Sequence, residues 1–164
     1  RQVIDFAYPG DYVGLGAVGH HTASAQASER TRLRAFPVSA FRDLARTNPE
    51  LSLRLYEAVS QELLAAREML MTVCQRTALE RVAAFLLALS RRNQRRGEAA
   101  HELVLPMTRT DIADFLGLTI ETVSRTFTKL RQAAAIKTEF KMTVSASRRR
   151  NQIYRTADRI RAVD

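Results

Sequence analysis

Residues 109–130 read RTDIADFLGLTIETVSRTFTKL, and this stretch decides the fold of the second half of the chain. Its pattern predicts two short amphipathic helices joined by a tight turn, a helix-turn-helix. Ala113 is small enough for the helices to cross closely, and Gly117 can adopt the positive φ that ends the first helix. Apolar residues at intervals of three and four predict the buried face of the second helix, 119–133: Ile120, Val123, Phe127 and Leu130.

Capping residues support both helices. Thr108 is placed to cap the first helix, with Asp111 three residues later as the acid of a capping box. Thr119 is placed to cap the second, and the carboxylate of Glu121 near its start suits the positive end of the helix dipole.

A polar face lies opposite the apolar face of the second helix and consists of Glu121, Ser124, Arg125 and Thr128. Such side chains carry the hydrogen-bonding groups that read base edges in DNA. A helical hairpin without DNA-binding function fits the same pattern, because Glu121 and Arg125 are four residues apart and can form an ordinary surface ion pair. Other features decide between the two readings.

The charge of the chain is strongly one-sided. Among its 164 residues are 26 basic and 17 acidic side chains, a net charge of +9. Residues 1–74 contain eight of each sign, so residues 75–164 contain the other 18 basic and 9 acidic side chains. The whole excess therefore lies with the helix-turn-helix, as expected of a surface that meets phosphates. This coincidence favours DNA binding.

Composition excludes several other classes. No apolar run is long enough for a membrane span and no signal peptide is visible, so we expect a cytoplasmic protein. Cys74 is the only cysteine, which suits a reducing compartment. Adjacent His20 and His21 point to opposite faces of a strand and lack a third ligand, which argues against a metal site. No nucleophile–base pair, phosphate loop or carboxylate pair supports an enzyme, and we expect no cofactor.

The first 37 residues read as short strands and turns. Apolar residues precede a turn at Pro9-Gly10-Asp11, alternating small and polar residues occupy 22–27, and Leu33 and Phe36 close a strand before Pro37. This pattern predicts part of a β-roll, because a sheet of this size cannot bury its own face. We therefore assign 1–47, with a short helix over 38–47, to a partial β-roll and expect the chain to begin inside a larger domain.

A long helix follows, with Asn48 as its cap and Pro49 in its first position, and we assign 48–75 to a dimerisation helix and hinge. One apolar stripe has coiled-coil-like spacing and predicts a dimer interface: Val59, Leu63, Ala66, Leu70 and Val73. A second stripe faces the chain's own β-domain: Leu51, Leu55, Ala58, Ala65 and Met69. The alternative is a helix buried on both faces within one monomer. We prefer a homodimer because little other structure remains to cover both faces.

Residues 76–164 are expected to form a winged helix-turn-helix domain. Cys74-Gln75-Arg76 is the predicted hinge, and Thr77 with Glu80 caps the next helix. A strand is expected over 102–105 and a hairpin, the wing, over 136–144. Cys74 at the hinge is a possible redox site, although a lone cysteine is more often a small buried apolar residue.

In this order, the pieces resemble the Crp/Fnr superfamily of bacterial transcription regulators, most closely its FixK-like and Fnr-like branches. The resemblance runs from about Phe6 to Ile136 and is carried by four segments: YPGDYVGL at 8–15, HHTASAQA at 20–27, ERVAAFLLALSRR at 80–92 and LPMTRTDIADFLGLTIETVSR at 105–125.

The resemblance implies an α+β protein with a β-roll, a long dimerisation helix and a carboxyl-terminal winged helix-turn-helix. It implies a regulator of transcription, an activator working with RNA polymerase, that binds a TTGAT- or TTGAC-like palindrome in double-stranded DNA as a homodimer. Arg125 would donate to guanine, Glu121 would accept from cytosine and Ser124 would contact the neighbouring pair. Phosphate contacts would come from Thr108, Arg109, Thr122, Thr128 and Lys129.

The chain departs from the family pattern in three places, and the first two bear on control. Arg34 stands where the Fnr branch has a cysteine ligand of an iron–sulfur cluster, and 21–24 lacks the arginine of cyclic-nucleotide binders. Both absences favour the FixK-like branch. Ala133-Ala134-Ala135 replaces the usual glycine before the wing, so the helix is expected to run on and the wing to start later. The alternatives are an effector-gated regulator with a small ligand in the β-roll, or a basic protein-interaction module.

Overall fold

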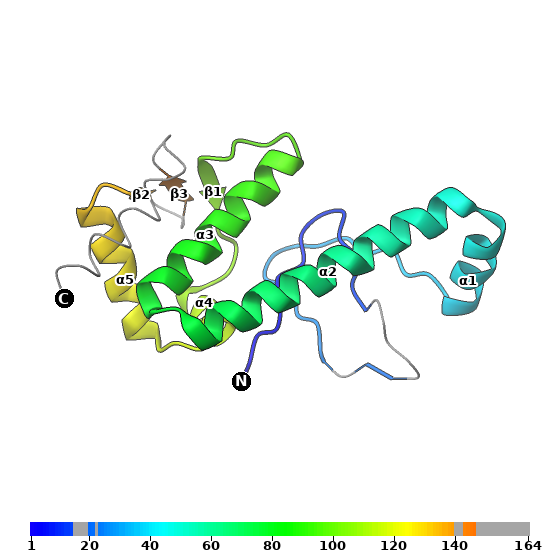
Figure 1. Cartoon of the computed structure of the whole chain (residues 1–164), viewed down its shortest axis with the longest axis horizontal. Helices are drawn as coiled ribbons and strands as arrows, with labels where there is room; N and C mark the ends of the chain where they lie inside the picture. The colour runs from blue at the N-terminus through cyan, green and yellow to red at the C-terminus, as the bar shows by residue number, and fades with distance from the viewer. Residues whose placement is uncertain (15–19, 22, 140–142, 147–164) are drawn as a thin grey trace. The chain divides into compact units, whose positions relative to one another are not determined.

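A computed structural model describes residues 1–14, 20–21, 23–139 and 143–146. The chain divides into two compact units, Ala7–Leu70 and a second unit that joins Arg1–Phe6 to Met71–Asp164. Figure 1 shows the order of helices and strands in the chain. The predicted boundaries at 47/48 and 75/76 stay predictions. No helix in the described part is long and apolar enough to cross a membrane.

In the residues that the structure describes, the second unit contains three complete helices and a small sheet. They are α3 (Ala78–Arg95), α4 (Arg109–Leu116) and α5 (Ile120–Gln132), with β1 (Glu102–Val104), β2 (Ile136–Glu139) and β3 (Thr143–Ala146). The strands are antiparallel in the order β1-β3-β2, with Leu103 opposite Val144 and Lys137 opposite Ser145. The hairpin of β2 and β3 is the predicted wing, and β1 adds the predicted strand.

The core of this unit is apolar, and it includes three of the four residues predicted for the buried face of the second helix: Val123, Phe127 and Leu130. Its fully buried large side chains are Val82, Leu86, Leu103, Ile112, Leu116, Val123, Phe127, Leu130 and Ile136. Ile120, predicted to be buried, is instead 42% exposed. It is the first residue of α5, and the buried residues of this helix begin at Val123.

The caps predicted from sequence are present. Thr77 with Glu80 and Thr108 with Asp111 form complete capping boxes, and the Thr119 hydroxyl accepts from the amide of Thr122. Gly117 ends α4 in the left-handed conformation, with φ 62° and ψ 43°. These contacts satisfy amide groups that a helix leaves unpaired, and so fix where each helix begins.

The expectation that α5 runs through the three alanines is wrong. The helix ends at Gln132, and Ala134 takes a left-handed φ of 53°. The amide of Ala134 donates to the Arg131 carbonyl at 2.9 Å and that of Ala135 to the Leu130 carbonyl at 3.0 Å, the two bonds of a Schellman turn. Ala135 is completely buried. The free energy gained by burying Ala135 and by pairing β2 from Ile136 onward thus exceeds the steric cost of the left-handed conformation at Ala134.

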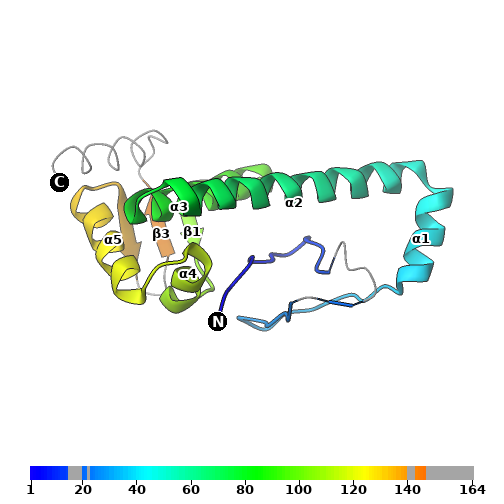
Figure 2. The same cartoon turned by 60° about the horizontal axis from the view of Figure 1, so that its bottom comes forward.

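The described residues of the first unit form α1 (Val38–Thr47) and most of α2 (Pro49–Gln75). Asn48 caps α2, because its side-chain oxygen accepts from the Leu51 amide at 3.1 Å. Figure 2 shows α2 as one long uninterrupted helix with α1 folded back at its start. Its second apolar stripe is half-buried at Leu51, Leu55, Ala58 and Met69, while Ala65 is exposed.

The strands expected before α1 are not formed: the described residues among the first 37 contain turns and extended chain but no strand. The predicted turn is present, with the Asp11 amide donating to the Tyr8 carbonyl at 3.0 Å. A strand needs a neighbour for its backbone groups, and this short segment supplies too few partners. Phe6, expected in the β-roll, packs instead with Phe115 and Phe85, at ring-centroid distances of 5.1 and 6.1 Å. Residues 15–19 and Thr22 of this pattern lie outside the described residues.

Ala134→Gly should raise the free energy of unfolding by about 1 kcal/mol, because glycine adopts a left-handed φ without the steric cost of a Cβ atom. Ala133→Gly is the matched control: Ala133 has φ −79°, so glycine there should lower stability by roughly 0.5–1 kcal/mol. Urea denaturation followed by circular dichroism measures both. Equal destabilisation by the two substitutions would contradict the left-handed assignment.

Candidate nucleic-acid interface

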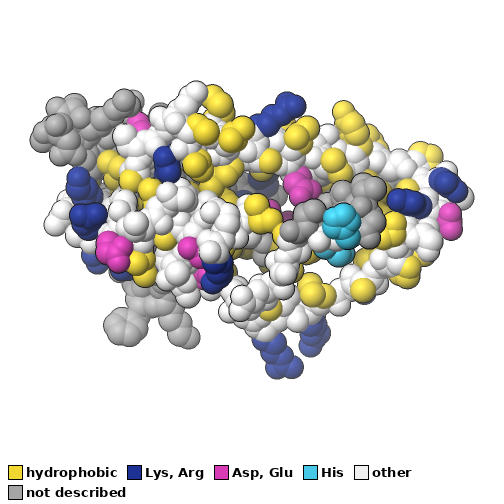
Figure 3. Space-filling view, turned by 90° about the horizontal axis from the view of Figure 1, so that it is seen from below, with side chains coloured by type: hydrophobic (Ala, Val, Ile, Leu, Met, Phe, Trp, Pro, Cys, Tyr) yellow, Lys and Arg dark blue, Asp and Glu magenta, His cyan; other side chains and the backbone are white. Residues whose placement is uncertain are grey.

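The helix-turn-helix presents a basic and polar surface. In Figure 3, several Lys and Arg side chains lie at the left-hand end, which carries α5, and others lie elsewhere on the visible face. Glu121, Arg125 and Lys129 on α5 are exposed, and Ser124 and Thr128 between them are half-buried. The face forms because the burial of Val123, Phe127 and Leu130 turns the opposite side of the helix toward solvent.

Five of the eight residues predicted to contact DNA surround one hollow. It has a volume of about 360 Å³ and is lined by Arg109, Ser124, Arg125, Thr128 and Lys129. Arg109 comes from the first position of α4, and the other four come from α5. Two helices therefore contribute to one concave surface with three basic side chains, and such a surface suits an anionic ligand.

Arg109 connects the start of α4 to the middle of α5. Its Nη1 donates to the Ser124 hydroxyl at 3.4 Å, and its guanidinium carbon lies 5.9 Å from the centre of the Phe127 ring. This is a cation–π contact, which is favourable because the face of an aromatic ring is electronegative. The arginine is therefore held near Ser124 on the open side of the helix-turn-helix.

Glu121 and Arg125 do not form the surface ion pair that the sequence allowed, and no contact within 4.0 Å joins these two described residues. Arg125 Nη2 instead approaches the Thr122 hydroxyl at 3.5 Å. Hydrogen bonds from its own backbone amide and from the Thr119 side chain lower the pKa of Glu121, with a smaller contribution from the charge of Arg125. Glu121 is therefore an ionised acceptor.

Thr108 and Thr122 do not line the hollow. The Thr108 hydroxyl donates to Asp111 Oδ2 at 2.7 Å and its amide donates to the same oxygen at 2.9 Å, so both donors serve the cap of α4. The Thr122 hydroxyl lies 3.1 Å from that of Thr119, at the first turn of α5. Both residues stand at helix N-termini, where the positive end of the helix dipole favours an anion.

Arg131 belongs to the same polar face, although sequence reasoning did not assign it. Its Nη2 donates to the Thr128 hydroxyl at 3.1 Å, and Thr128 in turn donates to the Ser124 carbonyl at 3.1 Å. The sequence spacing could have indicated this position, because Ser124, Thr128 and Arg131 are separated by four and three residues and so lie on one side of a helix.

The predicted dimer residues fall into two groups. Val59, Leu63 and Leu70 are 49%, 52% and 63% exposed, and Ala66 is exposed as well. Val73 is half-buried and lies in the other unit, where its Cγ1 is 3.9 Å from the position of a Cβ on Gly117. Within this chain, Val73 therefore packs toward the turn of the helix-turn-helix.

Cys74 is exposed one residue before α2 ends at Gln75, at the predicted hinge. Within the described ranges, no group of three or more His, Cys, Asp or Glu side chains could hold a metal ion.

The three helices with their tight turn and adjoining β-hairpin define a winged helix-turn-helix. Residues 80–148 match the family described as the Crp-like helix-turn-helix domain. The nitrogen fixation regulation protein FixK of Bradyrhizobium diazoefficiens is 43% identical over 136 residues, which cover 83% of this chain and 57% of that protein. The transcriptional activator protein Anr of Pseudomonas protegens is 37% identical over 143 residues, covering 86% and 59% respectively.

A solved structure agrees with these matches. FixK2 from Bradyrhizobium japonicum superposes with a TM-score of 0.63 at 31% identity, covering 72% of this chain and 57% of that one. The chain spans somewhat more than half the length of these relatives. It belongs to the Crp/Fnr family of transcription regulators. This membership confirms the resemblance found in the sequence.

Asp111→Ala should lower the free energy of unfolding by about 1 kcal/mol at neutral pH, because it removes the acid of the α4 capping box. Hydrogen bonds from the Thr108 side chain and backbone lower the pKa of Asp111 from its ordinary 3.8, with a further contribution from Arg1, whose Nη2 lies 2.5 Å from Asp111 Oδ1. Because the folded pKa is the lower one, this stability is fully present above pH 3.8 and is lost as the pH falls through the folded value.

The gap between wild type and Asp111→Ala in urea denaturation should therefore narrow as the pH is lowered from 7 toward 3. Asp114→Ala is the control, since Asp114 lies on the same helix and 3.7 Å from Arg1 but takes no part in the cap. It should cost less at neutral pH. A gap for Asp111→Ala that does not change with pH would contradict the role of the ionised carboxylate.

Proposed function

We propose that this chain is the dimerisation and DNA-reading part of a Crp/Fnr-type transcription activator. The observation that carries the proposal is the hollow formed by Arg109, Ser124, Arg125, Thr128 and Lys129, which combines base-reading chemistry with positive charge on the helix-turn-helix. Family membership supports it, since Anr is described as a transcriptional activator.

The proposed base readers are three residues of α5. Arg125 has the planar pair of donors that matches O6 and N7 of guanine in the major groove. Glu121 is an exposed acceptor with a lowered pKa, which suits the amino group of cytosine. Ser124 contacts the adjacent base pair. These roles fit half-sites like TTGAT or TTGAC.

The proposed phosphate contacts flank these readers. Arg109 and Lys129 supply positive charge at the rim of the hollow, and Thr128 supplies a hydroxyl. Thr108 and Thr122 stand at the N-terminal ends of α4 and α5, where helix amides favour phosphate oxygens. Such contacts fix the orientation of the protein on DNA without selecting a sequence.

A palindromic site requires two copies of the reading helix, and α2 is the proposed source of the dimer. Its stripe of Val59, Leu63, Ala66 and Leu70 is exposed along the helix, whereas the neighbouring stripe is half-buried at every residue except Ala65. Apolar side chains are visible at the surface along the upper edge in Figure 3. We further propose the domain boundaries at 47/48 and 75/76, and RNA polymerase as a partner.

The test begins with selection of bound duplexes from a random pool, followed by titration of selected and random duplexes at physiological salt. Arg125→Ala should weaken binding to the selected duplex by roughly 1–3 kcal/mol and relax the choice of base at the guanine position. Arg42→Ala, which removes an exposed arginine of α1, should change neither. Equal affinity of the wild type for both duplexes would favour the basic protein-interaction module instead.

Leu63→Glu should convert the dimer into a monomer, because it places a charge in the proposed seam without disturbing a buried core. Leu64→Glu is a closely matched control: Leu64 is also 52% exposed but lies off the seam. Sedimentation equilibrium of the variants gives the dissociation constants, with a rise of at least about a hundredfold, or roughly 2.7 kcal/mol, expected for Leu63→Glu alone. Equal weakening by both substitutions would show that the seam is assigned to the wrong face.

A further inference from the structure

We propose that Arg81 of α3 is a positioning residue for the reading helix: its guanidinium ties the turn of the helix-turn-helix to the joint between α2 and α3. The sequence pattern does not distinguish this side chain from its neighbours, although it lies in the matching segment ERVAAFLLALSRR. The inference rests on the proposed function, because it concerns how α5 is held for DNA.

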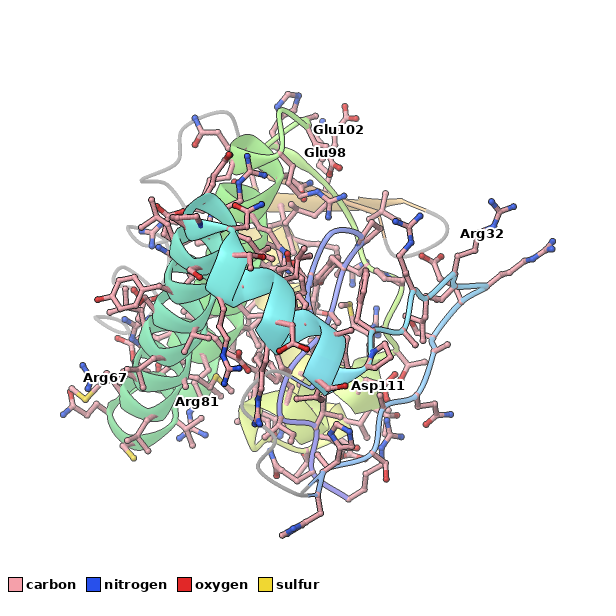
Figure 4. All side chains as sticks on the ribbon, turned by 90° about the vertical axis from the view of Figure 1, so that its right-hand side faces the viewer. Arg32, Arg67, Arg81, Glu98, Glu102 and Asp111 are labelled. Carbon is pink, nitrogen blue, oxygen red and sulfur yellow. The ribbon has the colours of Figure 1, made fainter. Side chains whose placement is uncertain are left out.

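The geometry is a bridge between two separate backbone segments. Arg81 Nε donates to the carbonyl of Arg76 at 2.9 Å, and Nη1 donates to the carbonyl of Leu116 at 3.1 Å. A longer contact of 3.5 Å joins Nη1 to the Gly117 carbonyl. All of these residues belong to the same compact unit. Arg81 is labelled in Figure 4.

On one side of the bridge, Arg81 completes the end of α4. The last carbonyls of a helix have no partner within the helix, and a cation there is favoured by the negative end of the helix dipole. α4 has eight residues and its last is Leu116, so each fixed end group matters to its stability. Gly117 follows in the left-handed conformation, and α5 begins three residues later at Ile120. Holding this turn therefore holds the start of α5.

On the other side, Arg81 holds the break between α2 and α3. α2 ends at Gln75 and α3 begins at Ala78, so Arg76 lies in the connection. Val73 of the last turn of α2 also approaches the turn, with its Cγ1 3.9 Å from the position of a Cβ on Gly117, and Thr72 is buried. A movement of this joint must therefore either carry the turn with it or break the hydrogen bonds of Arg81 to the Arg76 and Leu116 carbonyls.

An arginine is required at this position because two of its nitrogens donate hydrogen bonds to carbonyls of two different backbone segments. The guanidinium is planar and rigid, so Nε and Nη1 reach Arg76 and Leu116 together, whereas a lysine offers one ammonium group. Arg81 is half-buried, which raises the cost of leaving its donors unpaired. Without the bridge, ordering of the turn must take place at the moment of binding, which weakens specific recognition.

The experiment compares wild type with Arg81→Lys, Arg81→Gln and the control Arg91→Gln in the whole chain. Arg91 is an exposed arginine of the same helix, so the control makes the same charge change. Arg81→Lys keeps the charge and remains usable if Arg81→Gln does not fold, as judged by circular dichroism. Titrations use the selected duplex and a random duplex at one salt concentration, and hydrogen exchange is followed at the amides of Gly117 and Leu118.

We expect Arg81→Lys and Arg81→Gln each to lower the affinity for the selected duplex about tenfold. Arg81→Lys should leave the affinity for the random duplex unchanged, because binding to random DNA depends on charge and lysine keeps the charge. The Gly117 and Leu118 amides, which both donate to the Ala113 carbonyl in the native turn, should exchange faster. Arg91→Gln should change neither the selected-to-random affinity ratio nor the exchange.

Three results would overturn the inference: unchanged exchange at the turn, faster exchange without loss of specific affinity, or an equal loss of specificity in Arg91→Gln. If wild type does not distinguish selected from random duplex, the proposed function fails while the exchange measurement still decides the positioning role. In that case faster exchange in both Arg81 variants supports the bridge, and unchanged exchange contradicts it.

Discussion

The left-handed turn at Gly117 is the constraint on which the rest of the second unit depends. A Cβ there would meet only ordinary contacts, 3.8 Å from Arg81 Nη1 and 3.9 Å from Val73 Cγ1, so backbone conformation and not space calls for glycine. The turn sends the amides of Gly117 and Leu118 to the Ala113 carbonyl and ends α4 within eight residues. The chain then reverses direction so that α5 packs against α4, and Ile112 of α4 and Val123 of α5 are both fully buried.

Burial of one side of α5 determines what its other side can do. Val123, Phe127 and Leu130 are at most 1% exposed, so the rotation of the helix about its axis is fixed. The polar residues must then emerge together, and Arg109 from α4 joins them through the Phe127 ring and the Ser124 hydroxyl. A core contact thereby aligns five side chains around one hollow. The periodic pattern of α5 therefore determines both which side chains are buried and which side chains are presented to solvent.

Local chemistry explains which features could be predicted from the sequence. The caps at Thr77, Thr108 and Thr119 and the turn at Gly117 each depend on residues within a few positions, and all are present. The Schellman turn at Ala134 was missed because it depends on burial of Ala135, which neighbouring residues do not reveal. Arg81 was missed for a similar reason: its partner Leu116 is 35 residues away. The strands expected before α1 failed because a strand needs partners that this segment does not supply.

A carboxylate in the middle of a basic face is the last feature that the proposed function must explain. Glu121 repels phosphates, so it lowers affinity for DNA in general, and hydrogen bonds that lower its pKa keep it ionised. It is not neutralised by a salt bridge to Arg125, because no such pair forms between these described residues. In the proposed complex an ionised acceptor is favourable only opposite a base-edge donor, and unfavourable against any edge that offers acceptors alone. In the proposed complex, Glu121 would thus add specificity and lower general affinity, while the surrounding arginines and Lys129 would supply the affinity.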